Sequence, residues 1–278
     1  KMRGSPLSGT GSATCIGSSQ AQLPTRRPFT EVLKEAEYFY SCSGSKLLHR
    51  TNLASGDMSV FTLPSDIFSA AIFLVELPNK QVWILGSSSS SLKTEVRSID
   101  PFKDFAVLTQ PPMLEGRYGH CALYHQGFLY AIGGFNARVY LEHCERFDFS
   151  IWAWERIKPL PVPCCGPSTA VLDNRIYAFR GVSDQDGRVL LDIVQVFNSI
   201  SLQWNLLSVK LPKKSYCIPC FSVQDEGLLY FISDARLYSL NPETEVVDSI
   251  KALIISNQFY CFCSPCQFAK GALHISFY

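Results

Sequence analysis

Short apolar runs separated by turn residues dominate the chain, and the pattern is clearest in residues 116–161. An Arg–His opening there leads into an apolar strand, a glycine turn and a second apolar strand that ends at Gly133 and Gly134. Phe147 follows, with Trp154 seven residues further on. Apolar runs this short, bounded by glycine and proline, are typical of β-strands rather than helices. The segment therefore predicts four short strands.

The same pattern recurs along the whole chain. The second strand of each unit carries an aromatic residue, or a histidine in the last unit, and these markers are 43 to 53 residues apart: Tyr40, Trp83, Tyr130, Tyr177, Tyr230 and His274. An Asn or Asp opens the turn after the third strand, because such side chains bond the backbone two residues on: Asn52, Asp100, Asp148, Asn198 and Asn241. Six residues later the fourth strand carries Met58, Ala106, Trp154, Trp204 and Val247. Four-stranded units at this period are typical of β-propeller blades.

These motifs resemble kelch repeats over residues 36–278. The stretch 116–161 is the closest match, with the glycine pair, Phe147 and Trp154. Elsewhere the glycine pair becomes Arg180-Gly181 or Gly86-Ser87, and residues 216–258 lack both the pair and the tryptophan. The resemblance implies an all-β, kelch-type β-propeller over residues 29–278, in which twisted sheets bury their faces against one another.

The repeats do not give the number of blades directly. Six second-strand markers stand beside only five third-and-fourth-strand units. The chain begins with a second strand at 37–42 and ends with a first and second strand within 263–278. We predict six blades with an irregular or incomplete closing blade, whose C-terminal strands pair with N-terminal ones and so remove an exposed sheet edge. A chain cut short in its sixth blade is the alternative.

Composition limits the remaining possibilities. Residues 1–28 are rich in Ser, Gly, Thr and Pro, which predicts a disordered leader or linker. Residues 29–37 fit a short helix or part of a strand. A net charge of +1 disfavours a nucleic-acid partner, and the chain has no apolar run long enough to span a membrane. Eleven cysteines without a secretory signal predict free thiols in a reducing, cytoplasmic setting.

Several cysteines cluster near the starts of first strands in three successive units. Cys217 and Cys220, and likewise Cys263 and Cys266, have the spacing of zinc ligands. Both pairs, however, adjoin extended strands rather than tight turns, and cysteine suits a crowded inner strand. We therefore expect a packing role, no metal and no cofactor. A metal site at these four residues is the less favoured hypothesis.

The sequence presents no catalytic constellation. Its five histidines lie in different units, and neither a nucleophile elbow nor a phosphate-binding loop is present. His120 belongs to the Arg–His opening of its repeat. We therefore expect that the protein has no enzymatic activity. Because some kelch propellers are sugar-modifying enzymes of epimerase or oxidase type, that class remains the alternative.

The resemblance places the loops before first strands and those between second and third strands on one face of the ring, where partners bind. Arginine and tyrosine are the residue types that anchor protein interfaces. The candidate partner-binding residues in these loops are Arg117, Tyr118, Asn136, Arg138, Tyr140, Arg180, Asp184, Asp186, Arg188 and Tyr216. Ordinary solvated loop charge is the alternative interpretation.

We thus predict a non-enzymatic scaffold that binds a partner protein, through an acidic or polar peptide segment, at one face of the ring. Many kelch proteins are substrate receptors for ubiquitin ligases, which requires a BTB or F-box region. We expect neither in the 28-residue leader, which is too short to hold one. The substrate-receptor part of such an adaptor, separated from that region, is the second hypothesis.

Overall fold

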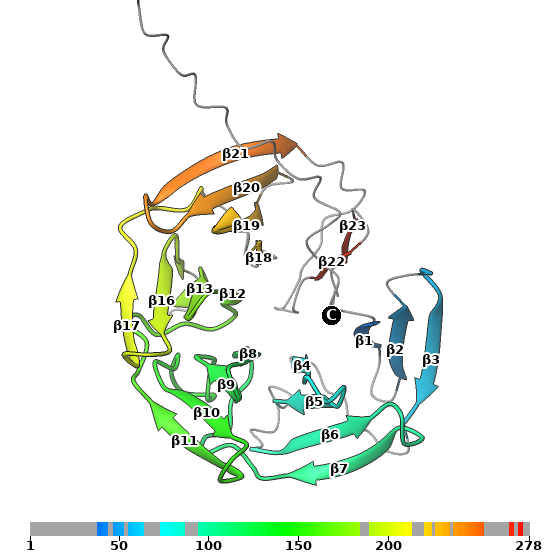
Figure 1. Cartoon of the computed structure of the whole chain (residues 1–278). Coiled ribbons are helices and arrows are strands. Elements are labelled where there is room, and N and C mark those ends of the chain that lie inside the picture. The colour runs from blue at the N-terminus through cyan, green and yellow to red at the C-terminus, as the bar shows by residue number, and fades with distance from the viewer. Residues whose placement is uncertain are drawn as a thin grey trace, which may run out of the picture.

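The computed structural model describes residues 38–43, 47–52, 55–63, 73–86, 94–183, 189–212, 220–223, 226–233, 236–252, 267–269 and 272–274. The sheets that these residues form follow one another around a central axis (Figure 1). Within each main sheet, strands that are consecutive along the chain pair antiparallel. The all-β propeller predicted from the sequence is confirmed.

Four sheets have four strands each. The first contains β4 (Phe73–Glu76), β5 (Val82–Leu85), β6 (Val96–Asp100) and β7 (Ala106–Gln110). The second, which we call the β8–β11 blade, contains β8 (Cys121–His125), β9 (Phe128–Ile132), β10 (Cys144–Asp148) and β11 (Ala153–Ile157). The third, the β12–β17 blade, contains β12 (Ser168–Leu172), β13 (Arg175–Phe179), β16 (Val194–Asn198) and β17 (Gln203–Leu206). The fourth contains β18 (Cys220–Val223), β19 (Leu228–Ser233), β20 (Arg236–Asn241) and β21 (Val246–Ala252).

Smaller sheets complete the described part of the chain. A three-stranded sheet contains β1 (Tyr38–Ser43), β2 (Leu47–Asn52) and β3 (Met58–Thr62). A short hairpin of β14 (Val182–Ser183) and β15 (Val189–Leu190) belongs to the connection between β13 and β16. Near the C-terminus, β22 (Gln267–Ala269) pairs with β23 (Ala272–His274). The six-blade count and the mode of closure stay predictions. So do the leader at 1–28 and the short helix or partial strand at 29–37, which lie outside the described residues.

The turn after each third strand is built as the sequence predicts. In four turns the side-chain Oδ1 of the Asx residue accepts a hydrogen bond from the backbone N–H two residues later, at 2.7 to 3.0 Å. Asn52 differs, because its Oδ1 accepts from Ser55 three residues on, at 3.0 Å. These local bonds fix the hairpin between the third and fourth strands, so the repeat can be read directly from the chain.

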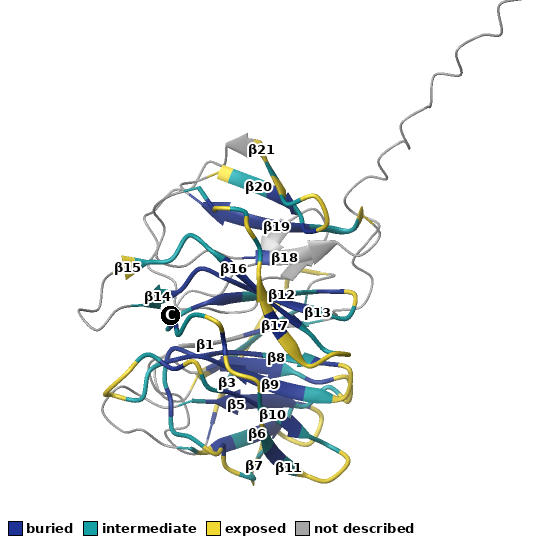
Figure 2. Cartoon of the chain, turned by 90° about the vertical axis from the view of Figure 1, so that its left-hand side faces the viewer, coloured by how far each residue is buried: buried dark blue, intermediate teal, exposed yellow. Residues whose placement is uncertain are grey.

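Aromatic pairs join successive blades through the core. Trp83 of β5 lies 5.1 Å from Phe147 of β10, measured between ring centroids. Equivalent contacts link Tyr130 to Phe197 at 6.0 Å, and Phe179 to Phe231 at 5.7 Å. Each pair contributes about 0.5–1.5 kcal/mol beyond the area it buries. Figure 2 shows the result, with buried residues along the strands and exposed residues gathered at the turns and on outer strands.

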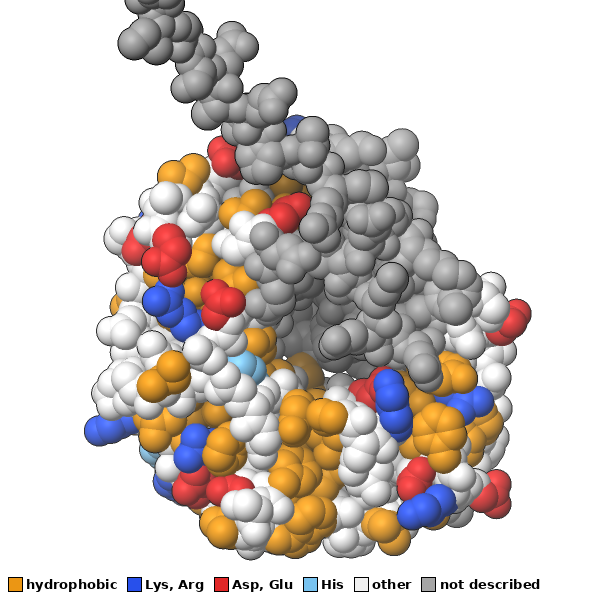
Figure 3. All heavy atoms as spheres, in the orientation of Figure 1, with side chains coloured by type: hydrophobic (Ala, Val, Ile, Leu, Met, Phe, Trp, Pro, Cys, Tyr) orange, Lys and Arg blue, Asp and Glu red, His pale blue; other side chains and the backbone are white. Residues whose placement is uncertain are grey.

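Exposed apolar side chains also occur at the turns between third and fourth strands. They include Phe102, Ile151, Trp152 and Ile200, which belong to three successive blades. Figure 3 shows hydrophobic side chains gathered on one face of the ring, in the lower part of the view. Among the described residues, no helix has the length and apolar character needed to cross a membrane.

Candidate functional site

The segment before β8 and the loop between β9 and β10 meet at one end of the β8–β11 blade. The N–H of Tyr118 donates to the carbonyl of Phe135 at 3.1 Å, and that of Phe135 donates back at 2.9 Å. A further backbone bridge joins Phe135 to Tyr140. The three rings consequently lie in a row, with centroid distances of 5.4 and 5.1 Å. We call these half-buried residues the aromatic ladder.

A tight turn beside the aromatic ladder projects two side chains into solvent. The Oδ1 of Asn136 accepts hydrogen bonds from the backbone N–H groups of Arg138 at 3.2 Å and Val139 at 3.0 Å. Ala137, between them, has a left-handed φ of 65°. Arg138 is exposed, and Val139 is 48% exposed. The turn thus presents one cation and one apolar side chain next to three aromatic rings.

Glu115 is hydrogen-bonded to the Asn136 side chain of this turn. Its Oε1 accepts a hydrogen bond from Asn136 Nδ2 at 3.1 Å, while its Oε2 lies 2.9 Å from His143 Nδ1 and 3.6 Å from an Arg156 guanidinium nitrogen. Burial alone would raise the pKa of Glu115, but the hydrogen bonds from His143 and Asn136 and the charge of Arg117 lower it below its usual value. Glu115 is therefore ionised at neutral pH and orients Asn136.

Arg117 is not available to a partner, contrary to the sequence prediction. Its side chain is only 1% exposed. It donates from Nη1 to the carbonyls of Gly133 at 2.8 Å and His143 at 2.7 Å, and it pairs through Nη2 with Glu145 at 2.5 Å. A buried arginine needs such partners to offset its lost hydration. The residue ties together the strands and loops of its own blade.

Arg180 is likewise buried, at 1% exposure, so its predicted role as an exposed anchor is also wrong. It occupies the place that Gly133 has in the preceding blade and keeps a left-handed φ of 58°. Its Nη2 donates to the carbonyl of Pro212 and, at 3.3 Å, to Ser233 Oγ in the next blade. The side chain serves as an interior link between blades.

The remaining predicted residues divide into two groups. The structure brings Tyr118, Asn136, Arg138 and Tyr140 together at one end of the β8–β11 blade. The other four candidates, which are Asp184, Asp186, Arg188 and Tyr216, lie outside the described residues. Phe135, the central ring of the ladder, was missed by the sequence analysis. Its position directly after the Gly133-Gly134 pair is the signal that could have identified it.

The described cysteines are free thiols: Cys121, Cys144, Cys164, Cys165 and Cys220. Burial raises the pKa of Cys144 to about 12 and that of Cys165 to about 11. Such thiols stay protonated and are poor nucleophiles and poor metal ligands. Within the described ranges, no group of three or more metal-ligating side chains occurs. Cys220 is buried on β18, and the other three candidate ligands, Cys217, Cys263 and Cys266, fall outside those ranges.

His120 is fully buried beside Phe73, with ring centroids 5.1 Å apart. Burial, and then the charge of Arg117, lower its pKa to about 3. The imidazole is consequently neutral at physiological pH and has no access to solvent. This environment fits a core residue at the start of a strand.

The β8–β11 blade, which carries this site, and the blade after it match a known repeat. The family model described as Kelch motif matches residues 116–161 and 163–208. This chain contains kelch repeats. The two matched ranges contain the β8–β11 and β12–β17 blades, which also keep the tryptophan of the fourth strand.

Curated proteins similar to this kelch-repeat chain include Kelch-like protein 38 of Homo sapiens, at 24% identity over 191 residues, which are 67% of this chain and 32% of that protein. Kelch-like protein 35 of Mus musculus is 31% identical over 136 residues, covering 48% of this chain and 23% of that protein. Beta-scruin of Limulus polyphemus is 25% identical over 162 residues, or 54% of this chain and 16% of that protein. The chain thus spans about a third of the length of the Kelch-like protein 38 that it matches. These relationships support a protein-interaction module.

Proposed function

We propose that this kelch propeller binds a partner protein at the loop end of the β8–β11 blade. One observation carries the proposal: two separate loops place the aromatic ladder beside the exposed Arg138 and Val139. Aromatic residues and arginine are enriched among the residues that dominate interface energies. A rigid blade that presents them on short loops also limits the entropy lost on binding.

The proposed ligand is an extended or turn segment of the partner with an acidic or polar residue next to an apolar one. The guanidinium of Arg138 can grip a carboxylate through two parallel hydrogen bonds. The apolar residue would pack on Val139 and the rings of Tyr140 and Phe135. Because Arg117 and Arg180 are buried, the electrostatic part of this recognition rests on fewer cations than the sequence suggested.

We further propose a scaffold role without enzymatic activity in a reducing compartment such as the cytoplasm. The protonated, buried thiols described above are consistent with that setting. A role as the substrate-receptor part of a ubiquitin-ligase adaptor concerns a longer protein and stays a hypothesis. A sugar-modifying activity gains no support from the geometry of the described residues.

The test is quantitative affinity purification with mass spectrometry on wild type and an Arg138→Glu/Tyr140→Ala double variant. We expect the specific partner to be recovered about tenfold less with the variant, which corresponds to about 1.4 kcal/mol of binding free energy. The matched control is Phe102→Ser, which alters an exposed apolar residue at the opposite end of a sheet. Unchanged recovery with the double variant, or an equal loss with Phe102→Ser, would contradict the proposal.

A further inference from the structure

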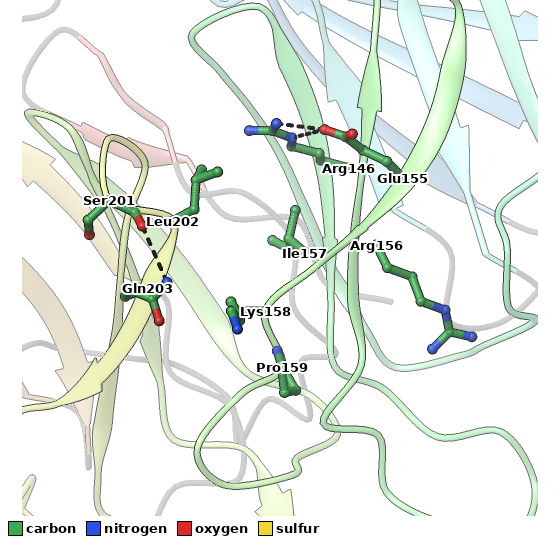
Figure 4. Close-up of a pocket in the computed structure, with 9 residues that line it drawn as sticks. All are labelled: Arg146, Glu155, Arg156, Ile157, Lys158, Pro159, Ser201, Leu202 and Gln203. Carbon is green, nitrogen blue, oxygen red and sulfur yellow. Dashed lines mark hydrogen bonds and ion pairs between the residues drawn. The ribbon is translucent and has the colours of Figure 1, made fainter.

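A groove with a volume of about 530 Å³ lies on the outer rim, where the β8–β11 blade meets the β12–β17 blade. One wall is the end of β11 and the residues after it, Ile157, Lys158 and Pro159. The other wall is the turn between β16 and β17, with Ser201 and Leu202, together with Gln203, the first residue of β17 (Figure 4). We call this surface the rim groove. It is separate from the aromatic ladder, so its role does not depend on the proposed function.

Apolar side chains line both walls of the rim groove. Ile157 is half-buried and Pro159 exposed on one side, and Leu202 is 36% exposed on the other. The neighbouring Ile200, in the same turn, is 73% exposed and extends the apolar surface beyond the groove. An apolar side chain of a ligand placed here would bury surface on two blades at once.

The three cationic side chains of the rim groove differ in whether a carboxylate lies beside them. Arg146 lies over the ring of Phe128 and pairs with Glu155 at 2.6 Å. The Arg156 side chain points away from the facing turn in Figure 4, and its guanidinium lies 3.6 Å from Glu115. Lys158 is exposed and forms no ion pair with any described residue. An acidic group of a ligand would supply a negatively charged partner for Lys158.

The backbone beside the rim groove belongs to an edge strand. In the sheet order β11-β10-β9-β8, β11 has a single neighbour, and in Figure 1 it runs along the outside of the ring toward the turn between β16 and β17. An edge strand can accept an additional strand through main-chain hydrogen bonds, with pockets for alternate side chains providing specificity. In such a strand, side chains two residues apart lie on the same side, about 7 Å from each other.

We infer that the rim groove binds an extended acidic peptide segment of a partner protein alongside β11. An Asp or Glu of the segment pairs with Lys158, and an apolar residue two positions away packs between Ile157 and Leu202. The occupant is a peptide strand because an edge strand, apolar lining residues and a lysine that has no ion pair within the described part of the chain occur together. The rim groove is therefore a second interaction surface, in addition to the loop end.

The test uses a fluorescein-labelled heptapeptide, Thr-Glu-Thr-Val-Thr-Glu-Thr, titrated with the whole chain and followed by fluorescence anisotropy. We expect saturable binding that weakens with salt, and at least about tenfold weaker binding for Lys158→Glu and for Leu202→Asp. A peptide with lysine in place of glutamate, and one with N-methylated central residues, should each bind at least about tenfold more weakly, because they remove the charge and the main-chain donors respectively.

Three controls establish where the peptide binds and that each variant is intact. Lys103→Glu, at an exposed lysine in another blade, should leave binding unchanged. The Arg138→Glu/Tyr140→Ala variant should also leave it unchanged, and a loss there would mean that the peptide binds the loop end. Circular dichroism and thermal unfolding establish that each variant is folded.

Three further results would overturn the inference. The first is the absence of binding by wild type at about 1 mM protein, the weakest affinity of interest here. The second is equal weakening by Lys103→Glu. The third is a concentration-dependent dimer in sedimentation velocity that Leu202→Asp abolishes, which would mean that a second copy of the chain covers the groove.

Discussion

The β8–β11 and β12–β17 blades use different side chains to hold the segment that precedes their first strand. Three residues before the Asx residue of its turn, the β8–β11 blade has Glu145 and the β12–β17 blade has Gln195, and both side chains are buried. Glu145 accepts a hydrogen bond from the N–H of Leu114 at 2.6 Å. Gln195 accepts one from the N–H of Val162 at 2.9 Å and donates one to its carbonyl at 3.0 Å. In each blade the third strand thus holds the segment that leads into the first strand.

The difference lies in what surrounds this shared bond. In the β8–β11 blade, the Glu145 carboxylate pairs with the buried Arg117 at 2.5 Å. In the β12–β17 blade the neutral Gln195 has the Cys164 thiol as its further contact, at 3.6 Å. The hydrogen bond to the incoming segment is therefore the common requirement, and the ion pair is an addition that one blade has and the other lacks.

Removing each of these side chains should show what the ion pair changes. Glu145→Ala leaves the buried guanidinium of Arg117 with only the more distant Glu115 carboxylate, at 3.9 Å, and should lower the free energy of unfolding by about 3–5 kcal/mol. Gln195→Ala leaves only neutral groups unsatisfied and should cost about 1–3 kcal/mol. Urea unfolding followed by tryptophan fluorescence measures both.

A double variant serves as the control for this comparison. Arg117→Met/Glu145→Gln removes both charges and keeps an acceptor for Leu114, so it should be more stable than Glu145→Ala. Equal losses for Glu145→Ala and Gln195→Ala would mean that the charge is unimportant and that the comparison of the blades fails.

The second contrast is between Gly133 and Arg180, which occupy equivalent positions with φ of 63° and 58°. A Cβ on Gly133 would lie 2.6 Å from the carbonyl oxygen of Cys164, so that backbone must move to accept any side chain. We expect Gly133→Ala to cost about 1–3 kcal/mol from the left-handed backbone, plus this clash.

Arg180→Gly, the reciprocal change, should cost less. It relieves the strained backbone while removing the bonds to Pro212 and Ser233. Thermal unfolding of the two variants side by side provides the measurement. A larger loss for Arg180→Gly would indicate that the side-chain links between blades outweigh backbone conformation.

His120 makes the β8–β11 blade sensitive to acid. Its pKa of about 3 in the folded chain lies below the ordinary value of 6.5. Between these two pH values the imidazole is protonated in the unfolded chain and neutral in the folded chain. Its contribution to stability is complete above pH 6.5 and declines as the pH falls toward 3. The decline should be about 1.4 kcal/mol per pH unit below 6.5.

Urea unfolding at pH 7 and pH 5 tests this effect. His120→Leu removes the titrating group, so the variant should lose less stability than wild type between these two values. His125, whose pKa burial also lowers, contributes in the same direction and remains in both proteins. His143→Gln, at a more exposed histidine, is the matched control. An identical pH dependence in wild type and His120→Leu would refute the prediction.

The sequence predicted those features that local bonds determine. Each Asx turn depends on contacts within a few residues, so Asp148 and Asn198 could be interpreted without a structure. Arg117 and Arg180 were misplaced because their burial depends on groups distant along the chain. Glu145 is 28 residues from the first of them, and Ser233 is 53 residues from the second.

The two proposed binding surfaces could likewise be predicted only in part from the sequence. Tyr118, Arg138 and Tyr140 were identified as loop residues, but only the backbone bridges reveal that the rings of Tyr118 and Tyr140 flank Phe135. The rim groove was not foreseen at all. Its walls come from two blades, and Ile157 and Leu202 line one groove only because β11 extends toward the next blade's turn.

The smallest expected effect concerns Glu115, which links the loop end of the β8–β11 blade to β11 through His143, Asn136 and Arg156. Glu115→Ala should change global stability by no more than about 1 kcal/mol, since the carboxylate is partly solvated and its contacts to His143 and Arg156 are near the surface. The buried Arg117 lies 3.9 Å from Glu115 and keeps its closer partner Glu145. Locally the substitution frees Asn136, so the amides of Arg138 and Val139 should exchange with solvent faster. Hydrogen exchange resolved by NMR measures this, with Glu95→Ala as a control at an exposed ion pair in another blade. Unchanged exchange at Arg138 and Val139 would show that the turn holds its shape without Glu115, and that its order comes from the aromatic ladder instead.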